Sequence, residues 1–243
     1  MKNILLLIFI ASSTFAYTQT DLESQIPKEV KYDNSVVDET YGIQLYEPLN
    51  MVLEGDSVRM ENGYAVNNWK EDFYADGAML HRGYYIDGQL KVYKNYYPNG
   101  QLEREFKNID GFRSLLKKYY SDGTLKSEVK YMESSALLWI DYYTNGKMEF
   151  YEEYHKSFLY HIAKRSYYES GQAESLLERV KKLDFTQNDF YKDGTNKIVG
   201  TLSYDMTSYD YYRTGKWMYY DEGGKAIKEE LYSDGKVTKS KDL

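Results

Sequence analysis

The sequence predicts an all-β protein: an elongated, open antiparallel sheet made of tandem β-hairpins. Three observations predict this fold. An aromatic pair, two further residues and a glycine recur about every 23 residues, and tyrosine supplies 29 of the 243 residues. The segments after the glycines alternate apolar and polar side chains, as half-buried strands do. Tyrosine suits such strands because its ring packs on a pleated surface while its hydroxyl reaches a polar partner.

Residues 1–16 have the three-part layout of a secretory signal peptide. Lys2 supplies the positive start, Ile4–Ala11 is apolar, and Thr14–Ala16 forms a small-x-small cleavage site. The apolar run is much shorter than the roughly 20 residues that cross a bilayer. We therefore expect an exported protein that is periplasmic, cell-surface or secreted.

The next two segments lack the repeat. Residues 17–40 are polar and irregular, which predicts a flexible leader. Residues 41–72 contain strand-like pieces with turns at Gly55-Asp56 and Asn62-Gly63, and we interpret them as a degenerate N-terminal cap.

Residues 73–243 form the repeat array, predicted as about seven hairpins. Asn-Gly or Asp-Gly after an aromatic pair is a strong hairpin signal. Pro98 predicts a type I turn with Gly100 in its fourth position, left-handed and forming a bulge. The turn glycines expected from the motif are Gly77, Gly100, Gly123, Gly146, Gly171, Gly194 and Gly215.

Two departures from the regular pattern carry further predictions. Ala136–Ile140 is apolar on both faces, which predicts a strand covered on both sides. At the C-terminus the period breaks, and Lys236, Lys239 and Lys241 would protect a last edge strand from edge-to-edge pairing.

The motif Tyr-Tyr-x-Asn/Asp-Gly-x-Leu-x-x-Glu resembles the MORN-repeat variant of bacterial proteins, often labelled YwqK-type antitoxin components. Tyr96–Glu105, Tyr119–Glu128 and Tyr232–Lys236 are the clearest matches, and the resemblance covers residues 73–243. It implies a long sheet of hairpins that contacts a protein or another ligand. The additional glycines of the classical MORN repeat are mostly missing, so the membrane-linked roles of that family are not carried over.

Composition excludes several classes of function. A net charge of −7 argues against nucleic acid, whose phosphates require a basic surface. After residue 16 no stretch is apolar enough for stable membrane insertion. The chain contains no cysteine, which removes disulfides, thiolate metal sites and the usual lipid attachment point.

We expect no catalytic residue, cofactor or metal. The three histidines, His81, His155 and His161, are interpreted as unrelated; on one strand the last two would lie about 20 Å apart. Glu149, Glu152 and Glu153 are interpreted as solvent-facing charges, although carboxylates can perform acid–base chemistry. Asp76, Asp122, Asp193 and Asp234 precede glycines and are expected to form turns.

The predicted function is that of an exported, non-enzymatic scaffold that binds a protein or glycan partner. An immunity or antitoxin-like protein is one alternative, and an enzyme with an unrecognised site is a second. Tyrosine offers a large, stiff contact surface, but it also packs across strands. The candidate partner-binding residues are Tyr97, Tyr120, Tyr143, Tyr168, Tyr191 and Tyr212.

Overall fold

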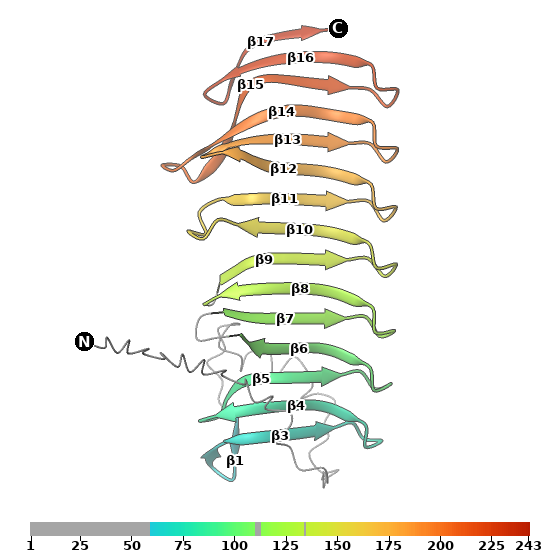
Figure 1. Cartoon of the computed structure of the whole chain (residues 1–243), viewed down its shortest axis with the longest axis vertical. Coiled ribbons are helices and arrows are strands. Elements are labelled where there is room, and N and C mark those ends of the chain that lie inside the picture. The colour runs from blue at the N-terminus through green and yellow to red at the C-terminus, as the bar shows by residue number, and fades with distance from the viewer. Residues whose placement is uncertain (1–58, 110–112, 134) are drawn as a thin grey trace, which may run out of the picture. The chain divides into compact units, whose positions relative to one another are not determined.

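The structure is a computed structural model that describes residues 59–109, 113–133 and 135–243 (Figure 1). Its regular elements are all strands, and fifteen of them form one antiparallel sheet in chain order from β3 to β17. The sheet is open, with β3 and β17 as its edges. The predicted fold class is therefore confirmed. The signal peptide, the flexible leader and residues 41–58 of the predicted cap lie outside the described residues.

The strands are short and follow one another closely. They are β1 (Met60–Glu61), β2 (Tyr64–Ala65), β3 (Asn68–Phe73), β4 (Met79–Ile86), β5 (Gln89–Tyr96), β6 (Leu102–Asn108), β7 (Arg113–Tyr119), β8 (Leu125–Met132), β9 (Ser135–Tyr142), β10 (Met148–Tyr154), β11 (His161–Tyr167), β12 (Ala173–Lys181), β13 (Asp184–Phe190), β14 (Asn196–Asp205), β15 (Asp210–Tyr220), β16 (Ala226–Ser233) and β17 (Lys236–Asp242). The described chain contains no helix of the length and hydrophobicity that a membrane crossing requires.

Seven turns of one kind lie along the same side of the sheet, at the right in Figure 1. In the turn that contains Pro98, the Gly100 amide donates to the Tyr97 carbonyl at 2.8 Å, and the Tyr97 amide donates to the Gln101 carbonyl at 2.8 Å. Gly100 has φ 80°, which only glycine adopts at little cost. The predicted turn with a left-handed glycine in fourth position is confirmed.

One extra residue also follows each of these turns, on the second strand of the hairpin. Tyr96 pairs with Leu102 and Asn95 pairs with Arg104, so Glu103 is an extra residue on its strand. The other six hairpins have an extra residue at the same place, and such bulges increase the local twist of a sheet. The seven extra residues are Leu80, Glu103, Lys126, Glu149, Glu174, Lys197 and Ile227.

Several turns on the opposite side are tighter. Asp87 and Gly88 have φ values of 49° and 77°, and Asp234 and Gly235 have the same pair of values. Two successive positive φ angles are typical of the two-residue type I′ turn that matches strand twist. The predicted turn at Asn62-Gly63 joins β1 to β2 in the same way, with φ values of 50° and 81°.

The prediction that Gly215 occupies the seventh turn is wrong. Gly215 lies inside β15, and the seventh turn is formed by Asp221–Gly224, where the Gly224 amide donates to the Asp221 carbonyl at 2.9 Å. Gly194 and Gly224 are 30 positions apart, which is 7 more than the common step of 23. The additional residues lengthen β14 and β15 to 10 and 11 residues.

The two faces of the sheet differ, and we name them after adjacent residues of β8. The Val129 face carries Tyr93, Phe106, Leu116 and Val129 in one cross-strand row, each at most 4% exposed. The Glu128 face carries charges that pair across strands, for example Lys117 with Glu128 at 3.4 Å.

The prediction that Ala136–Ile140 is covered on both sides is wrong. Trp139 continues the apolar row of the Val129 face because it pairs with Val129, yet it is 39% exposed. Every other residue of this segment is only half-buried. Coverage of the Val129 face is therefore much weaker at β9 than at β8.

Candidate functional site

A row of mainly polar side chains crosses the Val129 face on the side nearest the seven turns. The strand register forms this row, because the residue before each aromatic pair lies opposite the fourth residue after the turn glycine. Over β3–β13 this central row consists of Asp72, His81, Asn95, Arg104, Lys118, Ser127, Asp141, Phe150, Ser166, Ser175 and Asp189.

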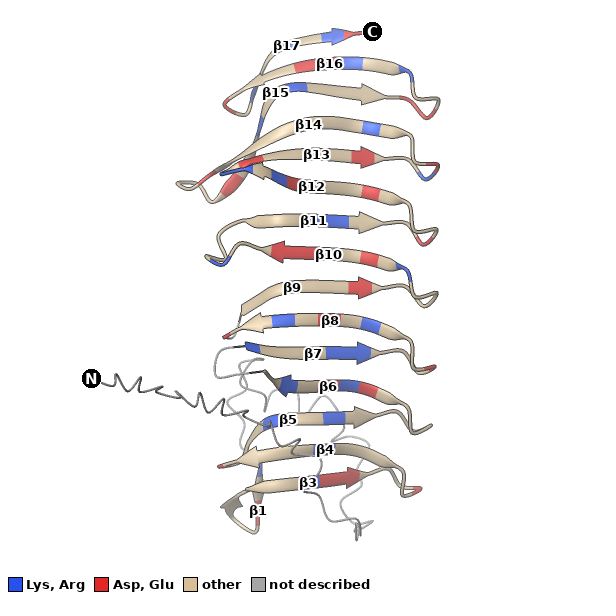
Figure 2. Ribbon diagram, in the orientation of Figure 1, with Lys and Arg blue, Asp and Glu red and all other residues tan. Residues whose placement is uncertain are grey.

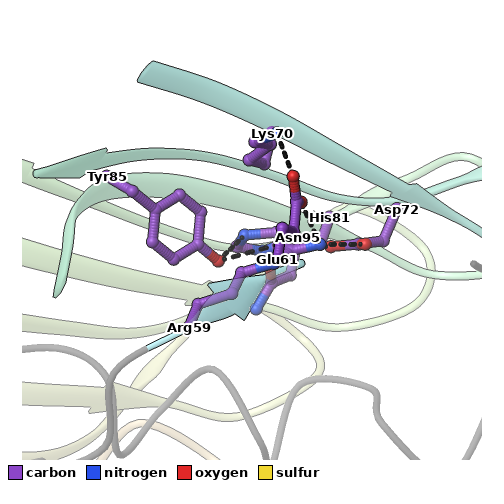
Figure 3. Close-up of polar contacts among 7 residues, drawn as sticks. All are labelled: Arg59, Glu61, Lys70, Asp72, His81, Tyr85 and Asn95. Atoms are coloured by element: carbon purple, nitrogen blue, oxygen red, sulfur yellow. Dashed lines mark hydrogen bonds and ion pairs between the residues drawn. The ribbon is translucent and has the colours of Figure 1, made fainter. Parts of the chain in front are cut away.

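The first residues of the central row join the Arg59 network, which comprises Arg59, Asp72, His81, Tyr85 and Asn95 (Figure 3). The Arg59 guanidinium donates to both carboxylate oxygens of Asp72, at 2.7 and 3.0 Å, and to the Tyr85 hydroxyl at 3.3 Å. Asp72, His81, Tyr85 and Asn95 are at most 1% exposed. Such a bidentate pair stabilises only if its remaining polar atoms are also satisfied.

His81 is held in its neutral form. Burial, the largest effect, lowers the pKa of His81 from 6.5 to about 4, against the opposing effects of Asp72 and Asn95. Its Nδ1 lies 2.5 Å from the Asn95 Oδ1, and its Nε2 lies 3.0 Å from the Tyr85 hydroxyl. The simplest tautomer donates from Nδ1 to Asn95 and accepts at Nε2 from Tyr85.

The Arg59 network is therefore an anchor between elements. Arg59 precedes β1, and its amide donates to the Gly88 carbonyl at 3.0 Å. Its side chain reaches β3 through Asp72 and β4 through Tyr85, and His81 continues the chain of bonds to Asn95 on β5. Both ring nitrogens of His81 are engaged, so this histidine has no free nitrogen with which to accept a substrate proton.

Five of the six candidate tyrosines lie along the turn side of the sheet, where their hydroxyls link consecutive hairpins. The Tyr97 hydroxyl donates to the Tyr119 carbonyl at 2.8 Å, and the Tyr143 hydroxyl donates to the Tyr167 carbonyl at 2.7 Å. The same bond recurs six times, and we call its donors the tyrosine ladder: Tyr74, Tyr97, Tyr120, Tyr143, Tyr168 and Tyr191. Burial raises the pKa of Tyr97, Tyr120, Tyr143 and Tyr168.

The structure separates Tyr212 from the other candidates. Tyr212 lies within β15 and pairs with Ser203, away from any of the seven turns. Tyr191 instead reaches the Tyr220 carbonyl at 2.9 Å, across the lengthened hairpin. Tyr74 belongs to the repeated motif but was not among the candidate residues, and it begins the ladder by donating to the Tyr96 carbonyl.

The turn residues add further links. The Asn99 and Asn145 side-chain amides donate to carbonyls of the next turn at 2.8 and 2.9 Å. The Asp122 carboxylate accepts the Thr124 amide at 2.8 Å, and this hydrogen bond lowers the pKa of Asp122. Asp76 and Asp193 make the same contact two residues ahead, so their predicted role as turn-formers is confirmed.

A second histidine cluster lies on the Val129 face at β10 and β11. His155 and His161 do not share a strand, because a turn separates them and His155 stacks on Tyr160 with ring centroids 4.7 Å apart. The His161 Nε2 lies 2.8 Å from a Glu152 oxygen, and its Nδ1 lies 3.1 Å from the Tyr211 hydroxyl. Burial lowers the pKa of His161, while Glu152 acts to raise it.

This cluster joins parts of the chain that are distant in sequence. The Tyr211 hydroxyl also accepts the His161 amide at 3.0 Å, and Tyr204 donates to the Leu159 carbonyl. The Tyr211 ring also packs edge-on against Phe185 and Tyr204, with ring centroids 5.0 Å apart in each pair. His161 and Glu152 stand out in the sequence but their partner Tyr211 does not, because a contact over 50 residues follows no local period.

Among the described residues, no group of three or more histidine, aspartate or glutamate side chains is arranged to hold a metal ion. The chain matches no protein-family model, and no curated protein shows significant similarity to it.

Proposed function

We propose that this protein is an exported, non-enzymatic repeat scaffold, of the MORN-variant type, that binds a protein or glycan partner along its sheet. The observation that carries the proposal is the strict repetition of the turn, the bulge and the tyrosine bond. Equivalent side chains of consecutive hairpins are thereby held two strands apart, roughly 9.6 Å. A surface ordered before binding loses little entropy when a partner docks.

The tyrosine ladder would contact a partner through its rings, because its hydroxyls already bond to the neighbouring hairpin. Its members are half-buried rather than buried. Lysines lie near two of the rings, with the Lys126 Nζ 5.5 Å from the Tyr120 centroid and the Lys197 Nζ 5.7 Å from the Tyr191 centroid. Large, stiff aromatic surfaces beside cations are favourable contact points for proteins.

Net charge favours a basic partner. At −7 the chain attracts positively charged surfaces at long range, and salt weakens this attraction. An immunity-like protein that meets an incoming basic toxin outside the cytoplasm is a version of the same proposal.

Site-specific photo-crosslinking tests the proposal. A photoreactive residue is placed at Thr144, in an exposed turn beside Tyr143, or at Lys182, in an exposed turn on the opposite side. Each version of residues 17–243 is incubated with envelope and culture-medium fractions of the producing cells. We expect a discrete adduct from Thr144 that diminishes as salt increases, and none from Lys182. Absence of an adduct from both positions, or equal labelling from both, would contradict the proposal.

A further inference from the structure

We propose that the Val129 face of β9–β13 carries a binding site for a neutral saccharide. The saccharide patch consists of Trp139, Asp141, Phe150, Ser175, Gln187 and Asp189. This inference rests on the proposed binding function and names the chemical class of one partner. The aromatic residues would contact the C–H faces of sugar rings, and the polar residues would accept hydrogen bonds from sugar hydroxyls.

The register brings these residues together on one face. Asp141 pairs with Phe150, and Ser175 pairs with Asp189, all within the central row. Trp139 and Gln187 lie two residues from Asp141 and Asp189, in the adjacent row of the same face. From β9 to β13 the patch spans four strand spacings, roughly 19 Å, which is enough for several sugar units in line.

Trp139 is the feature that distinguishes this region from the preceding strands. Its neighbours in the same row, Leu116 and Val129, are 2% and 1% exposed, whereas Trp139 is 39% exposed. The indole nitrogen donates to the Asp141 Oδ1 at 2.8 Å, which restricts rotation of the ring. An oriented indole at a water-accessible position has a negatively polarised face suited to the C–H groups of a pyranose.

The polar groups are also held in fixed orientations. The Gln187 side-chain amide donates to the Ser175 hydroxyl at 2.8 Å and to the Asp189 Oδ1 at 2.5 Å, and Ser175 donates to the same oxygen at 2.7 Å. Within the described residues, the Gln187 Oε1 and the second oxygens of Asp141 and Asp189 have no hydrogen-bond partner. Three oriented acceptors, two of them charged, match a ligand rich in hydroxyl donors.

Charge and composition argue against other ligand classes. Figure 2 shows both signs of charge on β9–β13, and Lys164 partly balances Glu152 at 3.7 Å. Asp141 and Asp189 repel phosphate and other anions. A protein contact would instead need a continuous apolar core. Here Glu152 and Lys164 separate Trp139 from Leu177 in one row, and Ser166 and Ser175 follow Phe150 in the other.

The experiment uses residues 17–243 and a defined panel of neutral hexasaccharides. The probes are β-1,4-linked glucose, N-acetylglucosamine, xylose and mannose, β-1,3-linked glucose and α-1,4-linked glucose, each titrated by calorimetry and tryptophan fluorescence. We expect at least one to bind with a micromolar to low-millimolar Kd and to change the emission. Trp139→Ala should weaken binding at least tenfold, and Asp189→Asn at least threefold. Trp69→Phe, on the Glu128 face, is the matched control and should leave affinity unchanged.

Circular dichroism verifies folding, and Asp189→Asn supplies the test if Trp139→Ala does not fold. Failure of the whole panel to bind, or unchanged affinity in both patch variants, would overturn the saccharide patch. A protein adduct from Thr144 without saccharide binding would overturn this inference while leaving the proposed function intact. Failure of both experiments would remove both.

Discussion

Two histidines on the Val129 face occupy contrasting environments. His81 is fully buried and bonds to the uncharged side chains of Tyr85 and Asn95, on its own strand and the next one. His161 is half-buried and bonds to the Glu152 carboxylate on the neighbouring strand and to Tyr211, 50 residues away. The first histidine belongs to a local anchor, and the second to a contact between distant hairpins.

The difference shows how a repeat sheet gains long-range structure. In a regular array each unit contacts only its neighbours, so stability is the sum of local terms. The first hairpins follow this rule, and burial is the main reason why His81 stays neutral. The lengthened β14 and β15 break the rule, because their additional residues carry Tyr204 and Tyr211 to the β10–β11 turn. One enlarged hairpin therefore couples units that the period would keep independent.

The largest expected effect comes from Gly200, which makes the lengthened hairpin possible. A Cβ atom at Gly200 would lie 2.2 Å from the Trp217 Cδ2. Trp217 is 2% exposed, and its indole nitrogen donates to the Thr201 carbonyl at 3.1 Å, so the ring has little room to move. We expect Gly200→Ala to lower the free energy of unfolding by about 3 kcal/mol, measured by denaturant titration.

Two other alanine substitutions are compared with Gly200→Ala. Gly223→Ala is the control, since its Cβ would meet only the Asp221 Oδ1, at 3.3 Å. Gly83→Ala probes the His81 region, where the Cβ would lie 2.5 Å from the tip of the Leu90 side chain. A Gly200→Ala protein as stable as Gly223→Ala would show that the indole does not require this glycine.

The second effect is the pH dependence of stability that His81 contributes. Folded His81 gains its proton near pH 4, whereas an unfolded histidine gains it near 6.5. Between these values the unfolded state binds more protons, so stability decreases as pH falls through the window, by about 3 kcal/mol at most. His81→Gln should remove this component from unfolding curves at pH 7, 6, 5 and 4. His155→Gln, near the surface, should retain it, and an unchanged slope in His81→Gln would contradict the assignment.

The sequence predicted the turns along the sheet well. Pro98, Gly100 and the Asn-Gly and Asp-Gly pairs specify their turns within four residues, because the required φ angles depend on those residues alone. Gly215 misled the prediction because Tyr211–Gly215 has the same local pattern. Whether Gly215 forms a turn or lies within a strand depends on the opposite strand, where Gly200 leaves room for the Trp217 ring.

The central row was partly accessible from sequence. The residue before the aromatic pair is polar in six repeats: Asp72, Asn95, Lys118, Asp141, Ser166 and Asp189. Aligning the repeats would have found this position. Its pairing with the fourth residue after each glycine depends on the extra residue just before that position, such as Glu103, and this second bulge has no local signature. The Tyr211–His161 contact has no local signature either, because it forms only when the β14–β15 hairpin is longer than its neighbours.

A third, smaller effect tests the coupling between distant hairpins. Tyr211→Phe keeps the ring on Phe185 but removes the hydroxyl that accepts the His161 amide. We expect a loss of about 1–2 kcal/mol, because a half-buried amide loses its partner. Hydrogen exchange should accelerate at His161 while the amides of β3–β5 keep their protection. Tyr209→Phe, whose ring is 64% exposed, is the matched control. Uniform acceleration over the whole sheet would show that the hairpins are not separable units.

The smallest effect distinguishes the tyrosine ladder from the tyrosine that sequence alone assigned to it. Tyr143→Phe removes the hydrogen bond to the Tyr167 carbonyl, and we expect it to lower the free energy of unfolding by about 0.5–1.5 kcal/mol. Tyr212→Phe is the matched control, because Tyr212 lies within β15 and outside the ladder, and its effect should stay below about 0.5 kcal/mol. The ladder bond joins adjacent hairpins, so Tyr143→Phe should accelerate amide exchange on both sides of the β10–β11 boundary. Equal costs for the two variants would mean that the repeated hydroxyl bond adds nothing to ring packing, and the ladder would then be free to exchange its carbonyl contacts for those of a partner.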